Sequence, residues 1–120
     1  MMRIHNCLEI ASKAVSGSVG RAASAIVHDS PDVRLVVFRM NLDDSVAMHT
    51  STSTVVLSAI SGTGVISGPV GGEIQDVTVS TGTVVTFEPN ELHGMRASQG
   101  PFVVLAAITP RPVGRTHAAA

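Results

Sequence analysis

Residues 82–95 read GTVVTFEPNELHGM, and this stretch combines a turn, a strand, a strand end and a histidine. Residues 84–87 are mainly β-branched or aromatic, types that favour a pleated, buried surface. Gly82 is typical of the turn before a strand, and Pro89 ends one because proline cannot donate a hydrogen bond to a neighbouring strand. His93 follows that stop, where the end of a strand can present it to a cavity. Taken alone, His93 is better interpreted as an ordinary loop histidine. A second histidine on a facing strand would make it part of a site.

The composition excludes several classes of function. A chain of 120 residues with 44% hydrophobic and 14% charged residues is typical of one folded domain with a real core. Eight basic and nine acidic residues give a net charge of −1, without a basic run. This balance argues against nucleic acid and anionic membranes as partners. Three phenylalanines are the only Phe, Tyr or Trp residues, which leaves little for stacking on bases.

The beginning of the chain carries no sign of export. Cys7 is the only cysteine, so no intramolecular disulfide can form, which fits a reducing compartment. Residues 1–17 mix Arg3, Glu9 and Lys13 among apolar residues and lack the continuous apolar centre of a secretion signal. No apolar run approaches the length of a membrane span. We expect a soluble, cytoplasmic protein.

Short strand-type segments separated by turn residues follow one helical candidate. Residues 8–15 have roughly helical spacing, with Asn6 as a cap and Gly17 as a stop. The strand candidates are 21–28, 33–40, 54–60, 65–67, 74–79, 84–87 and 102–109. With no helices between the strands, the pattern predicts an all-β, jelly-roll barrel. The predicted organisation is a helical extension at 1–20, the barrel at 21–110 and a flexible tail at 111–120.

His49 is a second histidine next to a predicted strand. It follows a turn and lies at the mouth of the strand predicted at 54–60. Two histidines entering a barrel from neighbouring strands can reach one metal ion through neutral imidazole nitrogens. The alternative is that each histidine only hydrogen-bonds the backbone of a turn.

These two segments resemble the paired motifs of the cupin family of β-barrels, over roughly residues 33–110. The first cupin motif places two histidines, a glutamate and a glycine where this chain has His49, Ser51, Val55 and Gly62. The second places a glycine, a proline and a histidine where this chain has Gly82, Pro89 and His93, with one extra residue before the proline. The resemblance implies a double-stranded β-helix barrel and a homodimer that pairs through an edge of a sheet.

The resemblance also implies a metal site, from which this chain departs. Cupin sites use three histidines and a glutamate, and only His49 and His93 remain; Ser51 is a poor ligand for a transition ion and Val55 cannot be one. Glu91 is a candidate third ligand, with a solvated loop carboxylate as the alternative. A divalent transition metal (Fe, Zn, Ni, Mn or Cu) would therefore be held weakly.

Two functions remain open on this basis. The first is a small-molecule-binding barrel whose pocket includes the two histidines with Ser51, Val55 and Met95. The second is a metal-dependent enzyme of the dioxygenase or isomerase type, with His49 and His93 as metal ligands. The lost ligands favour the first. Arg39, in an apolar strand, is either an outward-facing side chain or an interior anchor for a ligand carboxylate.

Overall fold

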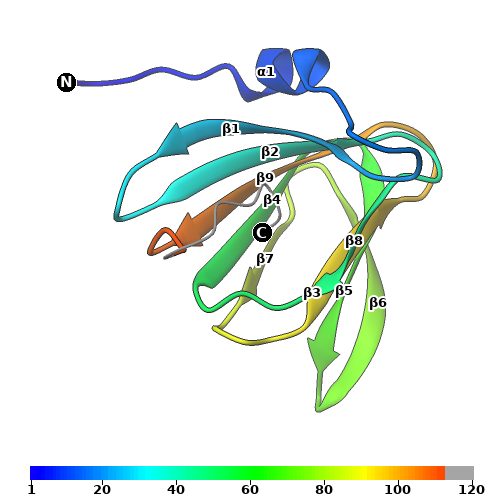
Figure 1. Ribbon diagram of the computed structural model, residues 1–120. Coiled ribbons are helices and arrows are strands. Elements are labelled where there is room, and N and C mark those ends of the chain that lie inside the picture. The colour runs from blue at the N-terminus through cyan, green and yellow to red at the C-terminus, as the bar shows by residue number, and fades with distance from the viewer. Residues whose placement is uncertain (113–120) are drawn as a thin grey trace.

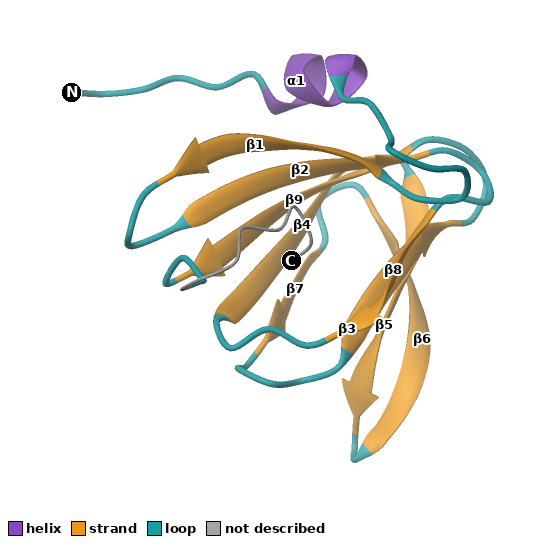
Figure 2. Ribbon diagram, viewed as in Figure 1, coloured by secondary structure: helices purple, strands orange, loops and turns teal. Residues whose placement is uncertain are grey.

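Two antiparallel sheets face each other in residues 1–112, the part of the chain that this computed structural model describes (Figures 1 and 2). The five-stranded sheet has the order β1 (Ala23–Asp29), β2 (Arg34–Met40), β9 (Phe102–Thr109), β4 (Thr54–Ser61) and β7 (Val84–Phe87). The four-stranded sheet has the order β3 (Ser45–His49), β8 (His93–Ala97), β5 (Thr63–Val70) and β6 (Glu73–Ser80). Of the tail predicted to be flexible, residues 113–120 lie outside the described part.

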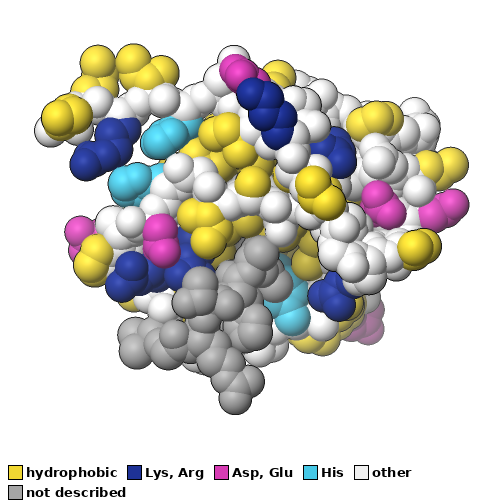
Figure 3. All heavy atoms as spheres, turned by 45° about the horizontal axis from the view of Figure 1, so that its top comes forward, with side chains coloured by type: hydrophobic (Ala, Val, Ile, Leu, Met, Phe, Trp, Pro, Cys, Tyr) yellow, Lys and Arg dark blue, Asp and Glu magenta, His cyan; other side chains and the backbone are white. Residues whose placement is uncertain are grey.

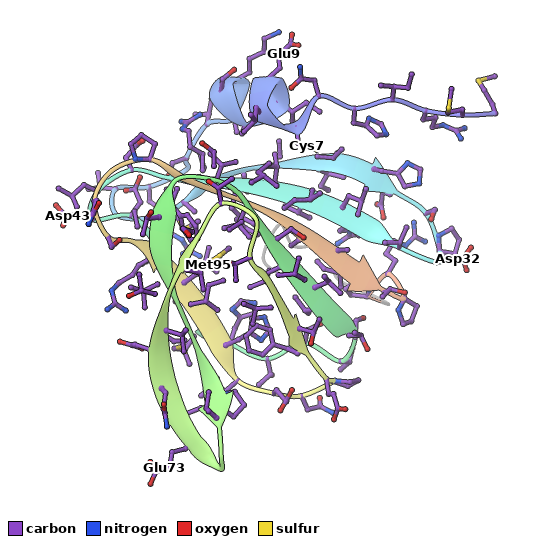
Figure 4. All side chains as sticks on the ribbon, turned by 180° about the vertical axis from the view of Figure 1, so that it is seen from behind. Cys7, Glu9, Asp32, Asp43, Glu73 and Met95 are labelled. Carbon is purple, nitrogen blue, oxygen red and sulfur yellow. The ribbon has the colours of Figure 1, made fainter. Side chains whose placement is uncertain are left out.

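The core fills the space between the two sheets. Val36, Phe38 and Met40 alternate along β2, and all three are buried against side chains of the opposite sheet. Met95 on β8 belongs to the same cluster, and Figure 4 shows its side chain between the sheets. Gly64 on β5 faces the ring of Phe102, because a Cβ there would lie 2.2 Å from a ring carbon. Because side chains fill the middle of the barrel, we look for a binding site at its ends.

The helix α1 (Cys7–Lys13) covers the outer face of the five-stranded sheet (Figure 1). Asn6 caps it by accepting a hydrogen bond from the backbone N–H of Glu9 at 3.1 Å, as the sequence predicted. Ala11 packs on Val37 and Val103 in a second apolar cluster. Arg39 lies on this face and donates a hydrogen bond to the carbonyl of Ala11. Arg39 therefore faces outward and fastens the helix, and it is not an anchor inside the barrel.

The strand predictions are confirmed for the apolar segments and incomplete elsewhere. The segments 84–87 and 102–109 correspond to β7 and β9, whereas the short strand expected at 65–67 extends over all of β5. The strands β3 and β8 were missed. Their residues, SVAMH and HGMRA, lack a clean alternation of apolar and polar side chains, so local pattern does not reveal them. Both histidines of interest lie in these two strands.

Charge is dispersed on one face of the molecule. On the face shown in Figure 3, Lys and Arg side chains lie among Asp and Glu side chains and do not gather into one patch. In the described residues, no helix has the length and apolar character needed to cross a bilayer.

Candidate functional site

His49 and His93 lie directly opposite each other on neighbouring strands. His49 is the last residue of β3, His93 is the first residue of β8, and the two are paired in the antiparallel ladder. Their ring centroids are 4.5 Å apart. The sequence placed His49 at the mouth of the strand at 54–60 and His93 beyond the end of the strand at 84–87. The structure corrects both positions, because each histidine belongs to a strand of the four-stranded sheet.

Two local features bring the rings together. The β3–β8 register shifts between Val46 and His49, and such a bulge re-aims the side chain that follows it. Gly94 allows β3 to approach β8 closely, since a Cβ there would lie 2.8 Å from the sulfur of Met48 and 3.0 Å from the carbonyl oxygen of Val46. The histidine pair therefore depends on an irregular strand facing a glycine.

Hydrogen bonds at Nδ1 fix how the two rings present their other nitrogens. His49 Nδ1 lies 2.8 Å from the carbonyl oxygen of Ala47, and His93 Nδ1 lies 2.9 Å from that of Glu91. A carbonyl can only accept, so each Nδ1 carries a proton and the neutral ring has its lone pair on Nε2. In His49 that Nε2 is buried and has no hydrogen-bond partner among the described residues. Within residues 1–112 it is an acceptor without a donor.

The environment disfavours the protonated form of His49. Burial lowers the pKa of His49 and the nearby ring of His93 lowers it further, while the hydrogen bond to the carbonyl of Ala47 acts in the opposite direction. His93 is only 2% exposed, and Phe87 stacks on its ring with centroids 4.6 Å apart. The site is thus a contact group of two imidazoles and a phenyl ring.

An apolar pocket of about 140 Å³ adjoins this group through Phe87. Its wall includes Ile66 and Gly68 of β5, Val77 of β6 and Val85 of β7, together with Phe87. Glu91 also lines it. A side chain at position 68 would occupy space beside the phenyl ring, since a Cβ there would lie 2.5 Å from a ring carbon of Phe87. The pocket beside Phe87 is therefore small and apolar.

The other predicted site residues lie in the core or in the loops. Val55 and Met95 are in the core cluster that also contains Phe87. The Ser51 hydroxyl accepts a hydrogen bond from the backbone N–H of Ser53 at 3.1 Å, so it serves its own loop. The Glu91 carboxylate accepts one from the N–H of Glu88 at 2.7 Å, so it holds the turn before β8.

The donor set does not form a three-ligand metal site. Within residues 1–112, no group of three or more His, Cys, Asp and Glu side chains could surround a metal ion. Glu91 reaches the histidine pair with its backbone carbonyl, while its carboxylate is engaged by Glu88. The residues present fit a two-histidine contact, which is fewer than the three protein ligands of typical zinc sites.

Solved structures of other proteins share this architecture closely. An uncharacterised conserved protein with a double-stranded β-helix domain from Klebsiella pneumoniae superimposes with a TM-score of 0.77 at 21% identity, over 95% of this chain and 95% of that one. An RmlC-like cupin protein from Desulfovibrio desulfuricans gives 0.73 at 24% identity, over 92% and 98%. A cupin superfamily protein from Desulfitobacterium hafniense gives 0.67 at 18% identity, over 85% and 88%.

The chain has the cupin fold. No protein-family model matches the sequence, and no curated protein matches it either. The predicted fold class, an all-β double-stranded β-helix barrel with a short N-terminal helix, is confirmed. In this cupin barrel His49 and His93, the two histidines predicted from the sequence to form a site, are in contact.

Sequence reasoning missed three contributors to the site. Phe87 was recognised as a strand residue only, and its stacking on His93 arises across the loop at 88–92. Gly94 and the carbonyl of Ala47 act through the β3–β8 contact, which the sequence did not predict. The one signal available was the glycine directly after His93, because a glycine inside a strand often marks a close approach of another backbone.

Proposed function

We propose that this barrel binds a small organic molecule at the end where His49 and His93 meet, with at most weak metal binding. The observation that carries the proposal is the buried Nε2 of His49, which has no partner among the described residues. Leaving such an acceptor unsatisfied costs about 1–3 kcal/mol. A ligand that supplies a donor there recovers this free energy, so the position favours occupation.

The surroundings define the kind of molecule. A neutral imidazole with its proton on Nδ1 accepts at Nε2, so the ligand should offer an N–H or O–H group. The adjoining pocket of about 140 Å³ is lined mostly by apolar side chains around Phe87. Ligand sites for drug-sized molecules are about 300–1,000 Å³, so a smaller ligand is expected here. A small apolar molecule with one donor fits both features.

A metal-dependent enzyme of the dioxygenase or isomerase type is the second candidate. The Nδ1–carbonyl hydrogen bonds of His49 and His93 favour it, because histidines that bind metals through Nε2 typically donate Nδ1–H in this way. A bound transition metal would supply Lewis-acid or oxygen-activating chemistry. The lack of a third ligand in residues 1–112 counts against it. From the resemblance we also infer a homodimer, and from the single cysteine and the charged N-terminal residues we infer a cytoplasmic protein.

The test compares the wild-type protein with His49→Phe, which keeps an aromatic ring and removes both ring nitrogens. Histidine ring ¹⁵N spectra are recorded during titration with small aromatic alcohols and amides. We expect the His49 Nε2 signal to move on binding, and the response to disappear in His49→Phe. Because the variant also removes a buried unsatisfied acceptor, its ligand-free form should be at least as stable as the wild type.

Elemental analysis of protein purified without chelators or a metal-affinity tag separates the two candidates. Far less than one metal per chain agrees with the binding barrel. A content near one metal per chain in the wild type, lost in His49→Phe, would favour the metal-dependent enzyme over the binding barrel. A His49 signal that no donor compound moves, in metal-free protein, would contradict both.

A further inference from the structure

A second pocket, of about 310 Å³, lies at the other end of β3. Ser45 begins this strand and lines the second pocket, whereas His49 ends it. At a rise of about 3.3 Å per residue, the two ends are roughly 13 Å apart. The backbones of Arg21 and Ser45 meet in a parallel bridge, so the loop before β1 and the start of β3 form the wall together. This pocket is separate from the histidine pair.

Arg21 gives the pocket its charge. Elsewhere on the barrel, Arg34 pairs with Asp29 and Arg96 pairs with Asp76. In the described part of the chain, the Arg21 side chain has neither an ion pair nor a hydrogen bond, and no other charged residue lines the pocket. Asp44, in the nearby turn, does not line the pocket, and its carboxylate accepts a hydrogen bond from the N–H of Asn41. A guanidinium beside a cavity without a carboxylate is a place for an anion.

The remaining walls are divided between hydroxyls and apolar groups. Ser24 is the cross-strand partner of Phe38 and shares its face, so this hydroxyl stands beside the phenyl ring at the end of the core. Ser45 supplies a second hydroxyl, and Ala22 and Val46, which pack against the core, supply apolar surface. The cavity therefore offers one cation with hydroxyl donors and an apolar floor.

The loop that carries Arg21 is already ordered. The Ser16 hydroxyl makes hydrogen bonds to the carbonyls of Ser18 and Arg21, at 2.7 and 2.8 Å. The N–H of Arg21 donates to the carbonyl of Ser18 at 3.3 Å. A wall that is ordered before binding loses less entropy when a ligand enters.

We infer that this pocket binds a small monocarboxylate with a short apolar tail. The planar guanidinium fork matches a carboxylate, and the serine hydroxyls can donate to the same oxygens. One positive charge balances a monoanion and does not suit a phosphate dianion. The apolar floor at Phe38 and Val46 has no role for an inorganic ion, whereas it suits a hydrocarbon tail. This inference stands independently of the histidine site.

The test follows amide NMR shifts during titration with hexanoate, hexan-1-ol and inorganic phosphate. We expect hexanoate to shift the amides of Ser24, Phe38 and Val46, and hexan-1-ol to bind about tenfold more weakly or worse. Arg21→Gln should weaken hexanoate binding by a similar factor, because it removes a charge-assisted hydrogen bond. Arg21 is exposed, so the variant should fold like the wild type.

Arg3→Gln is the matched control. Arg3 is exposed and has no partner in the described residues, but it lies in the N-terminal segment outside the pocket. It should bind hexanoate like the wild type. Equal binding of hexan-1-ol or phosphate, or unchanged affinity in Arg21→Gln, would overturn the inference. Shifts confined to residues around His93 would also overturn it.

Discussion

At the scale of single residues, His49 is a half-buried imidazole whose Nε2 atom is buried. Burial and the neighbouring His93 both lower its pKa below the usual value of 6.5. The carbonyl of Ala47 fixes the proton on Nδ1, which leaves Nε2 as the only nitrogen that can accept. The lowered pKa and the position of the proton both follow from the surroundings of the ring in the fold.

A pH dependence of stability follows from this. In the unfolded chain His49 takes up a proton near pH 6.5, whereas in the folded chain it resists protonation to a lower pH. Between these two values the unfolded state binds more protons, so the free energy of unfolding falls as the pH falls. Urea unfolding at about pH 7.5 and about pH 5.5, on either side of a free histidine's pKa, should show this loss in the wild type. His49→Phe should lose less; an equal loss in both proteins would refute the explanation.

At the scale of elements, the pair β3–β8 decides whether a site exists. Both strands have five residues, and β3 contains the bulge that aims His49. At Gly94 the backbone of β8 lies too close to β3 for a larger residue, because a Cβ there would clash with Met48 and Val46. We therefore expect the packing of β3 against β8 to depend more on the small size of Gly94 than on the identity of the exposed residues in these strands.

We expect Gly94→Ala to destabilise the protein by about 1–3 kcal/mol, as overpacking does. It should also separate the two imidazoles, which a loss of the NOE between the His49 and His93 rings would report. Gly100→Ala is the matched control, since a Cβ at Gly100 meets nothing within 4 Å. Urea unfolding measures both variants. If Gly94→Ala keeps the wild-type stability and the NOE, the glycine is not what brings the strands together.

At the scale of the whole molecule, the sheet edges are unequally protected. The edge strands β1 and β3 carry register shifts, and β7 has only four residues. The strand β6 is eight residues long, pairs with β5 without interruption and exposes Ile74 and Val77. A long, regular edge with apolar side chains is a template for pairing with another strand. We therefore expect the predicted homodimer to form through β6.

Light scattering coupled to size-exclusion chromatography tests this expectation. The wild type should elute as a dimer, and Val77→Lys should elute as a monomer because a lysine on the edge opposes strand pairing. Val84→Lys, a change at an exposed position of the short strand β7, should remain dimeric. A wild-type monomer, or a dimer that survives Val77→Lys, would rule out pairing through this edge.

Much of the architecture could be predicted from the sequence because it depends on neighbours along the chain. The apolar segments became β2, β4 and β9, the four residues before Glu88 became β7, and Asn6 capped α1. Turn glycines such as Gly82, with φ of 96°, separate these strands because glycine tolerates positive φ. Many short strands with such turns leave an all-β barrel as the way to bury their apolar faces.

The sequence by itself therefore determined the class of fold, most strand positions and the two histidines worth following. The tertiary structure alone decided that His49 and His93 face each other and that Arg21 lies beside a separate pocket. It also decided that the Nε2 of His49 is buried with no partner among residues 1–112. The physical reason is that strand propensity is local, whereas register, a bulge and the contact at Gly94 arise between segments distant in the chain. Burial and missing partners, which give these groups their chemistry, exist only once those segments have met.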